Sequence, residues 1–124
     1  MIPKFRAWLK KKQKMDNKID HISWLEDELY CIGDGITYMV LAEDLVLMQS
    51  TGLKDKNGQE IFEGDIVKMA KDVYSKPTYY EVVRHRGGAY RLESKQHGCE
   101  LWLRHTDCEV VGNIYENREF LEDK

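Results

Sequence analysis

Residues 47 to 68 read Leu47-Met-Gln-Ser-Thr-Gly-Leu-Lys-Asp-Lys-Asn-Gly-Gln-Glu-Ile-Phe-Glu-Gly-Asp-Ile-Val-Lys68, and this stretch decides the fold class. Its pattern predicts a strand that ends at Thr51-Gly52, a tight turn at Lys56-Asn57-Gly58 and a second strand after Gly64-Asp65. Asn-Gly between apolar runs is a strong hairpin signal, because both central residues of the favoured turn need a positive φ. The stretch therefore predicts a β protein and carries little information about chemistry.

Length and composition limit the class of protein. The chain has 124 residues, which suits a single domain over 1–124, with an N-terminal hairpin and meander over 1–45 and a barrel-like core over 46–124. No apolar run approaches the length of about 20 residues that a membrane span needs. Three cysteines do not indicate a disulfide framework. We expect a cytoplasmic protein without a secretory signal.

The charges are unevenly distributed. Residues 1–18 carry seven cations and one anion, a balance of +6, and the whole chain carries −3, so the remaining residues carry −9. Such segregation can steer a charged partner, and it can equally place a basic arm against an acidic neighbour in an oligomer.

Turn signals divide the rest of the chain into short strands. Upstream of the deciding stretch, alternation and β-rich composition predict strands at 3–8, 15–22, 36–41 and 45–49, with a lysine-rich turn at 10–14. Residues 22–32 have roughly helical spacing of their apolar residues, but strand-like composition and a following turn favour two strands, at 22–25 and 28–32, over a helix. Downstream they predict strands at 66–70, 78–84, 89–93, 100–104 and 108–112, and a final short strand leading to a helical turn within 113–121.

Many short strands separated by turns predict a mostly β fold. We expect a small SH3-like barrel or a sandwich of short antiparallel strands, with an N-terminal hairpin. The predicted core residues are Phe5, Leu53, Ile61, Ile66, Val82, Leu101, Val111 and Ile114.

Several motifs resemble the YopX family of small phage and prophage proteins. They are Lys4-Phe-Arg-Ala-Trp8, residues 47–58, Ile61-Phe-Glu-Gly-Asp-Ile-Val67 and Glu109-Val-Val-Gly-Asn-Ile-Tyr-Glu-Asn117, in the order of the family. Leu9 and Arg118 depart from the pattern, which commonly has Asp and Pro there. The resemblance implies a compact, mostly β protein encoded in a phage or prophage genome. It supplies no catalytic residue.

Two His/Cys pairs are weak candidates for a metal site. His97-x-Cys99 and His105-x-x-Cys108 together offer the two histidines and two cysteines that suit tetrahedral zinc. However, they flank Leu101-Trp-Leu103, which has the character of core, and their spacing is not that of a zinc knuckle. We therefore predict no metal and no cofactor.

Basic residues near aromatic rings favour nucleic-acid binding as an alternative function. One group is the lysine turn, and the other is a predicted hairpin whose cations alternate with tyrosines, as on single-strand binding surfaces. Structure alone also explains both groups: the lysines suit the solvated tip of a hairpin, and the arginines suit the outer surface of a barrel whose tyrosines pack inside. The net charge of −3 weakens the nucleic-acid alternative. The candidate residues are Lys10, Lys11, Lys12, Lys14, Arg84, Arg86, Tyr90 and Arg91.

Catalytic patterns are scarce. The chain has no Gly-rich phosphate loop. Glu60, Glu63 and Asp65 have the oxygen ligands that a hard cation needs, but Asp65 is better explained as the residue that closes the turn before its strand. A small enzyme is the least favoured class.

These observations favour a non-enzymatic protein-interaction or assembly module. Small β domains commonly bind partners by strand addition at an exposed edge. We expect a homo-oligomer, with an unidentified phage or host protein as a further partner.

Overall fold

The computed structural model describes residues 4–25, 29–34, 36–70, 76–85, 87–95 and 97–122. The chain divides into two compact units, residues 1–50 and residues 51–124. The division falls inside one long strand, β6, which runs from Leu45 to Lys54. None of the helices in the described ranges has the length and apolar character that a membrane crossing requires.

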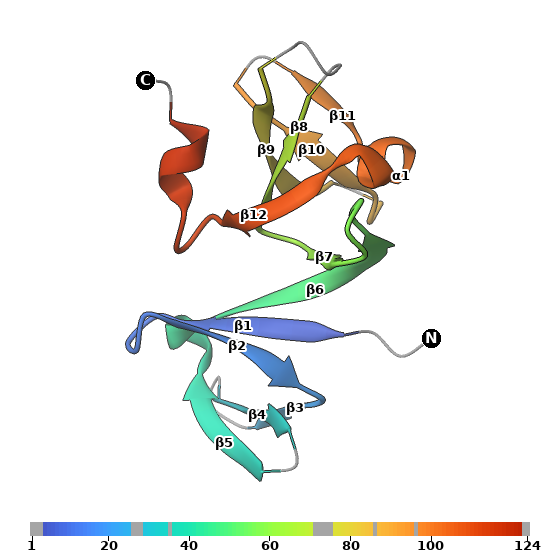
Figure 1. The fold of residues 1–124 in the computed structure, drawn as a ribbon. Coiled ribbons are helices and arrows are strands. Elements are labelled where there is room, and N and C mark those ends of the chain that lie inside the picture. Colours follow the sequence, from blue (N-terminus) through green and yellow to red (C-terminus); the bar gives the residue numbers. More distant parts are fainter. Residues whose placement is uncertain are drawn as a thin grey trace. The chain divides into compact units, whose positions relative to one another are not determined.

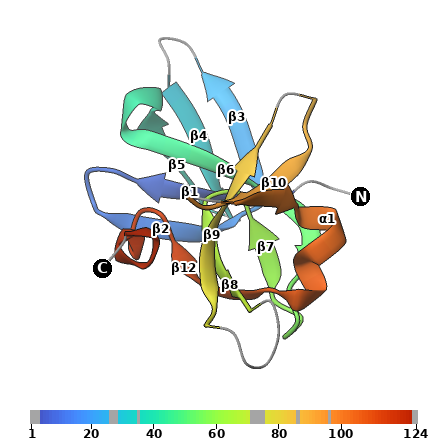
Figure 2. The same ribbon diagram turned by 90° about the horizontal axis from the view of Figure 1, so that it is seen from above.

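The first unit consists of antiparallel strands. Strand β1 lies between β2 and β6, and a second sheet has the order β3-β4-β5, so that β4 is central (Figure 2). Tyr38 on β5 and Ile32 on β4 are cross-strand partners. The strands are β1 (Phe5–Leu9), β2 (Lys14–Ile19), β3 (His21–Leu25), β4 (Leu29–Asp34) and β5 (Ile36–Leu41), followed by the 3-10 turn η1 (Ala42–Asp44) and β6.

Alternation along the strands gives this unit its core. Ala7 and Leu9 on β1 are buried, and Phe5 on the same face packs against them, as the period of two requires. Ile32 on β4 is fully buried in the same cluster. Tyr38 and Val40 of β5 pack against this cluster, so the alternate residues of β5 face away from it.

The second unit contains a five-stranded antiparallel sheet with the order β11-β10-β9-β8-β12 (Figure 1). The last residues of β6 lie beside β7, where Thr51 Oγ1 donates to the Ile61 carbonyl over 2.8 Å. The strands are β7 (Glu60–Phe62), β8 (Asp65–Met69), β9 (Thr78–Arg84), β10 (Tyr90–Glu93), β11 (Gly98–Glu100) and β12 (Glu109–Asn113). The predicted hairpin around Gly87-Gly88 is confirmed by the pairing of β9 with β10.

Cross-strand pairs build the core of this unit. Val67 is paired with Tyr80, and Val82 with Leu92, and all four side chains are buried in one cluster. Residues of the opposite parity lie on the other face of the sheet, which places Glu81 there, directly opposite Glu93.

The turn in the deciding stretch has a different geometry from the predicted one. β6 continues through Thr51-Gly52 to Lys54, and the strand after the turn is β7, which the sequence interpretation missed. Asp55 N–H donates to the Gln59 carbonyl over 2.8 Å, and Gly58 N–H donates to the Asp55 carbonyl over 3.0 Å. The loop thus has three residues, with only Gly58, at φ 82°, in the left-handed region. A three-residue loop needs one such residue, so the prediction of two was wrong.

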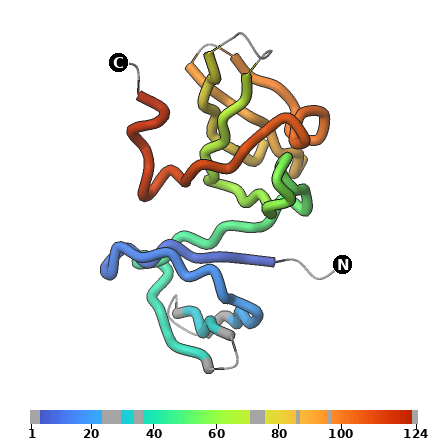
Figure 3. Tube along the Cα trace, in the orientation of Figure 1, coloured from blue at the N-terminus to red at the C-terminus, as the bar shows by residue number. Residues whose placement is uncertain are grey.

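The predicted strand at 100–104 is also wrong. Residues Leu101–Arg104 form a single helical turn, α1, followed by the 3-10 turn η2 (His105–Asp107), and the chain then returns as β12 (Figure 3). Leu101 is fully buried, whereas Trp102 is 64% exposed and Leu103 is 57% exposed. A strand would place Leu101 and Leu103 on the same face, and the helical turn separates them.

A side-chain network ends β12. The Asn113 side chain accepts the backbone N–H groups of Tyr115 and Glu116 over 3.0 and 2.9 Å, and Asn117 Oδ1 accepts Asn113 N–H over 3.1 Å. The Asn117 side chain lies where a Cβ on Gly112 would be, so the close approach requires glycine there. The chain then forms the predicted helical turn, η3 (Arg118–Leu121).

The prediction of a mostly β fold with short antiparallel strands and an N-terminal hairpin is confirmed. Of the predicted core residues, Ile61, Ile66, Val82 and Leu101 are fully buried. Partial burial is found for Phe5, Leu53, Val111 and Ile114.

Candidate functional site

The residues that carry the family resemblance perform structural tasks. The Asp55 side chain, 5% exposed, accepts the N–H groups of Asn57 and Gln59 through Oδ1, over 2.9 and 2.8 Å, and that of Val110 through Oδ2, over 2.9 Å. Asp65 accepts Phe62 N–H over 2.8 Å, which confirms that it closes the turn before β8. These carboxylates are committed to the backbone, and a functional surface must be sought elsewhere.

The lysine turn is the first candidate. It joins β1 to β2, with Leu9 opposite Lys14, and Gln13 adopts φ 51° there. Lys11 forms an ion pair with Asp44 over 3.3 Å. Four other lysines of the turn and of β2 form no ion pair with a carboxylate among the residues that the structure describes; they are Lys10, Lys12, Lys14 and Lys18.

A hollow of about 420 Å³ lies beside this turn. Lys12, Lys14 and Lys18 line it together with Tyr38 from β5, and Lys12 Nζ lies 6.0 Å from the centre of the Tyr38 ring. The Tyr38 hydroxyl donates to Asp16 over 2.6 Å. Burial of the phenol and this bond to a carboxylate both raise the pKa of Tyr38, so the phenol stays neutral and its hydroxyl continues to donate to Asp16.

The second basic group, on β9 and β10, is largely neutralised. Arg91 Nη1 lies 2.6 Å from Glu100 Oε1, and Arg91 Nε lies 3.8 Å from Glu93. His85 Nε2 lies 2.7 Å from the same Glu93 carboxylate. Arg84 is exposed, and Arg86 lies outside the described residues.

The aromatic residues of this hairpin are not presented for base stacking. Tyr80 is buried in the core, and Tyr79 stacks on Phe120 of η3 with ring centres 5.1 Å apart. Tyr90 packs against the core, and its burial raises the pKa of its phenol. This face therefore offers few free cations and few free rings, in contrast to the lysine turn.

The weak metal candidates are held by other contacts. His105 Nδ1 donates to the Lys54 carbonyl over 2.7 Å, and the Cys108 thiol donates to the Arg104 carbonyl over 3.3 Å. Burial raises the pKa of Cys108 to about 12 and also raises that of Cys99, so both thiols stay protonated at neutral pH. Within the described ranges, no three His, Cys, Asp or Glu side chains gather as a metal site, and His97 is exposed.

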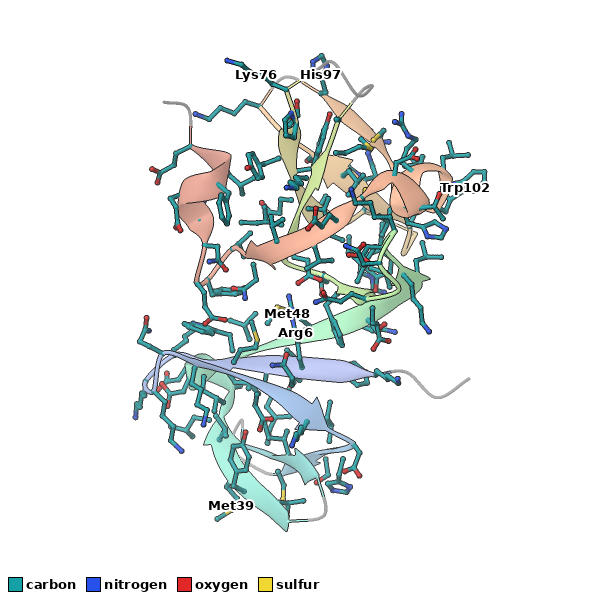
Figure 4. All side chains as sticks on the ribbon, in the orientation of Figure 1. Arg6, Met39, Met48, Lys76, His97 and Trp102 are labelled. Carbon is teal, nitrogen blue, oxygen red and sulfur yellow. The ribbon has the colours of Figure 1, made fainter. Side chains whose placement is uncertain are left out.

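An edge strand is a candidate that sequence reasoning missed. β5 ends its sheet, and within the described part of the chain no strand is paired with its outer side. Its outward side chains include Met39, which is 66% exposed and is labelled in Figure 4. Leu41 on the same strand is 40% exposed. The apolar run of β5 was visible in the sequence, but its position at an edge depends on the sheet order.

β3, at the other side of the same sheet, also has no Asp, Glu, Lys or Arg, but the remaining outer strands are protected in ways that β5 is not. β2 has the same length but carries Lys14 and Lys18, while β7 and β11 have three residues each. The outer side of β12 is capped where Val110 N–H meets Asp55. Charge, shortness and covering are the usual protections of a sheet edge, and the six residues of β5 include no charged side chain.

Comparison with known proteins places the chain in a family. The sequence model of the YopX protein family matches residues 4–122. The crystal structure of protein EF1440 from Enterococcus faecalis is 32% identical, with a TM-score of 0.62, and the match covers 98% of this chain and 99% of that one. The structure of protein yopX from Bacillus subtilis shares the fold at 19% identity and a TM-score of 0.67, over 95% of this chain and 97% of that one. No curated protein matches. The chain belongs to the YopX protein family.

Proposed function

We propose that this protein is a non-enzymatic protein-interaction and assembly module, a phage or prophage accessory protein acting in the bacterial cytoplasm. The observation that carries the proposal is the outer side of β5, with which no strand of the described ranges pairs, together with the exposed Met39. Strand addition at such an edge supplies main-chain hydrogen bonds, and the outward side chains add apolar contact. An unidentified phage or host protein remains a further partner of the assembly.

A second copy of this chain is the proposed occupant of the edge. Two β5 strands paired antiparallel about a two-fold axis would place uncharged residues opposite one another along their whole length. Like charges opposite each other destabilise a strand pair, and β5 has none to bring together. By the same rule, a pair of β2 edges would bring Lys14 and Lys18 close to one another.

Sedimentation velocity tests this proposal with two matched variants. Met39 and Trp102 are exposed to nearly the same extent, 66% and 64%, but they lie in different units (Figure 4). We expect a dimer for the unmodified chain, a monomer for Met39→Lys and a dimer for Trp102→Lys, over protein concentrations from about 1 to about 100 µM. A monomeric unmodified chain, or equal loss of dimer in both variants, would remove β5 as the assembly edge.

Nucleic-acid binding is the second candidate function, favoured by the lysine turn. Lys10, Lys12, Lys14 and Lys18 have no carboxylate partner among the described residues, so their charge is available to phosphates. The ion pairs of Arg91 with Glu100 and Glu93 argue against the β9–β10 hairpin as the binding surface. Anisotropy of labelled DNA and RNA under a salt titration tests this candidate.

A further inference from the structure

The hollow beside the lysine turn combines several groups that suit a phosphate. Its volume of about 420 Å³ lies within the range of small-ligand pockets. Strand β2 and the turn supply its cations, and β5 supplies an aromatic wall. The residues that matter are Lys12, Lys14, Lys18, Asn17, Tyr38 and Asp16.

The hollow has more positively charged than negatively charged side chains in its lining. Three ammonium groups and one carboxylate leave a formal charge of +2. The carboxylate of Asp16 is already engaged, because it accepts the Tyr38 hydroxyl over 2.6 Å and the Lys18 backbone N–H over 2.9 Å. None of the three lysines forms an ion pair within the described ranges. The hollow therefore favours an anion.

We propose that this hollow binds a phosphate group of a single-stranded nucleic acid, an inference that rests on the second candidate function above. Lysine ammonium groups act as point charges on phosphate oxygens, and Asn17, which also lines the hollow, has an amide that can donate to a phosphate. The Tyr38 ring, which Lys12 already approaches, provides the aromatic surface that single-strand binding sites place beside their cations. Lys10 extends the cationic track along the turn beyond the hollow.

The decisive experiment compares two double variants with the same change of charge. Lys14→Gln/Lys18→Gln removes two cations of the hollow, and Lys54→Gln/Lys76→Gln removes two exposed cations that lie outside both the hollow and the lysine turn. Binding of a labelled mixed-sequence single strand is followed by anisotropy while salt is titrated. We expect at least about tenfold weaker binding and a salt slope shallower by about 1.4 for the first variant, and less than about twofold weakening for the second.

Asp16→Asn provides a test in the opposite direction. It removes the anion of the hollow while keeping an oxygen that can accept the Tyr38 hydroxyl, so we expect tighter binding of the single strand. A variant that merely misfolds would not bind more tightly. Unchanged or weaker binding by correctly folded Asp16→Asn, checked by circular dichroism, would contradict the proposal.

The remaining outcomes separate the two levels of the inference. If the unmodified chain binds no DNA or RNA at low salt, the second candidate function itself fails. Equal weakening in both double variants would leave nucleic-acid binding in place and remove the hollow as its site. Competition experiments distinguish the source of the anion. If inorganic phosphate displaces the labelled strand and unlabelled DNA does not, the ligand is a free phosphate. If polyglutamate displaces the labelled strand as effectively as unlabelled DNA does, the ligand is an acidic protein. Either result would overturn the assignment to nucleic acid.

Discussion

Two hairpin turns of this protein each need one residue in the left-handed region, and they use different residues for it. The turn at 55–59 places Gly58 at its left-handed position and buries Asp55, whose carboxylate accepts three backbone N–H groups. The turn at 10–13 places Gln13 at its left-handed position and exposes a run of lysines, most of which have no carboxylate partner in the part of the chain that the structure describes. The difference teaches that the first turn directs its polar side chain to the backbone, whereas the second directs its charged side chains to solvent.

Asp55→Ala should have the largest effect on this comparison. It removes the acceptor for three N–H groups, one of them on β12, and leaves them without their partner in a poorly hydrated place. We expect a loss of about 3 kcal/mol in the free energy of unfolding, measured by urea denaturation. Asp55→Asn, which keeps one acceptor oxygen, should lose less. Equal losses in the two variants would mean that the acceptor oxygen that asparagine keeps contributes nothing.

Gly58→Val tests the left-handed position of the stable turn. No atom lies within 4 Å of a Cβ built at Gly58, so the cost comes from the backbone conformation alone. We expect a loss of about 2 kcal/mol, since a β-branched residue tolerates positive φ poorly. Asparagine is the control, because it adopts this region more readily. Unchanged thermal stability of Gly58→Val would remove the turn assignment.

Gln13→Gly is the mirror experiment in the lysine turn. Glycine should relieve the strain of φ 51° but loses the Gln13 side-chain bond to the Lys10 carbonyl and gains freedom in the unfolded chain. We expect a net gain of about 0.5 kcal/mol in unfolding free energy. A clear loss of stability would instead show that the side-chain bond makes this turn as structural as the other.

Glu81 sharpens the comparison, because it is a carboxylate without the donors that Asp55 has. Burial, with a contribution from Glu93, raises its pKa above 4.5, although Arg118 opposes the shift. The folded state then holds more protons than the unfolded state between pH 4.5 and the raised pKa, so this group lowers stability as pH rises through that window. Glu81→Gln should therefore stabilise the protein at pH 7 but not below pH 4, the smallest effect of the four. Urea titrations at both values measure it, and an equal gain at both would exclude the titration as the cause.

Much of the fold followed from local patterns. The β9–β10 hairpin was predictable from β-branched and aromatic residues around Gly87-Gly88, and β4 and β5 from their apolar composition. The lysine turn was predicted as a candidate from its charges, but the hollow beside it was not, because Tyr38 reaches it from a strand more than twenty residues away. α1 was missed because one helical turn is too short to show a helical period.

By itself, then, the sequence determined the positions of turns and the alternation of most strands, because these depend on φ preferences and on side chains a few residues apart. Only the tertiary structure decided which strand became an edge, how Asp55 reaches Val110, and which basic residues keep their charge free. Those properties depend on groups distant in the chain: a hydrogen bond or an ion pair is made only after folding has brought its two partners together.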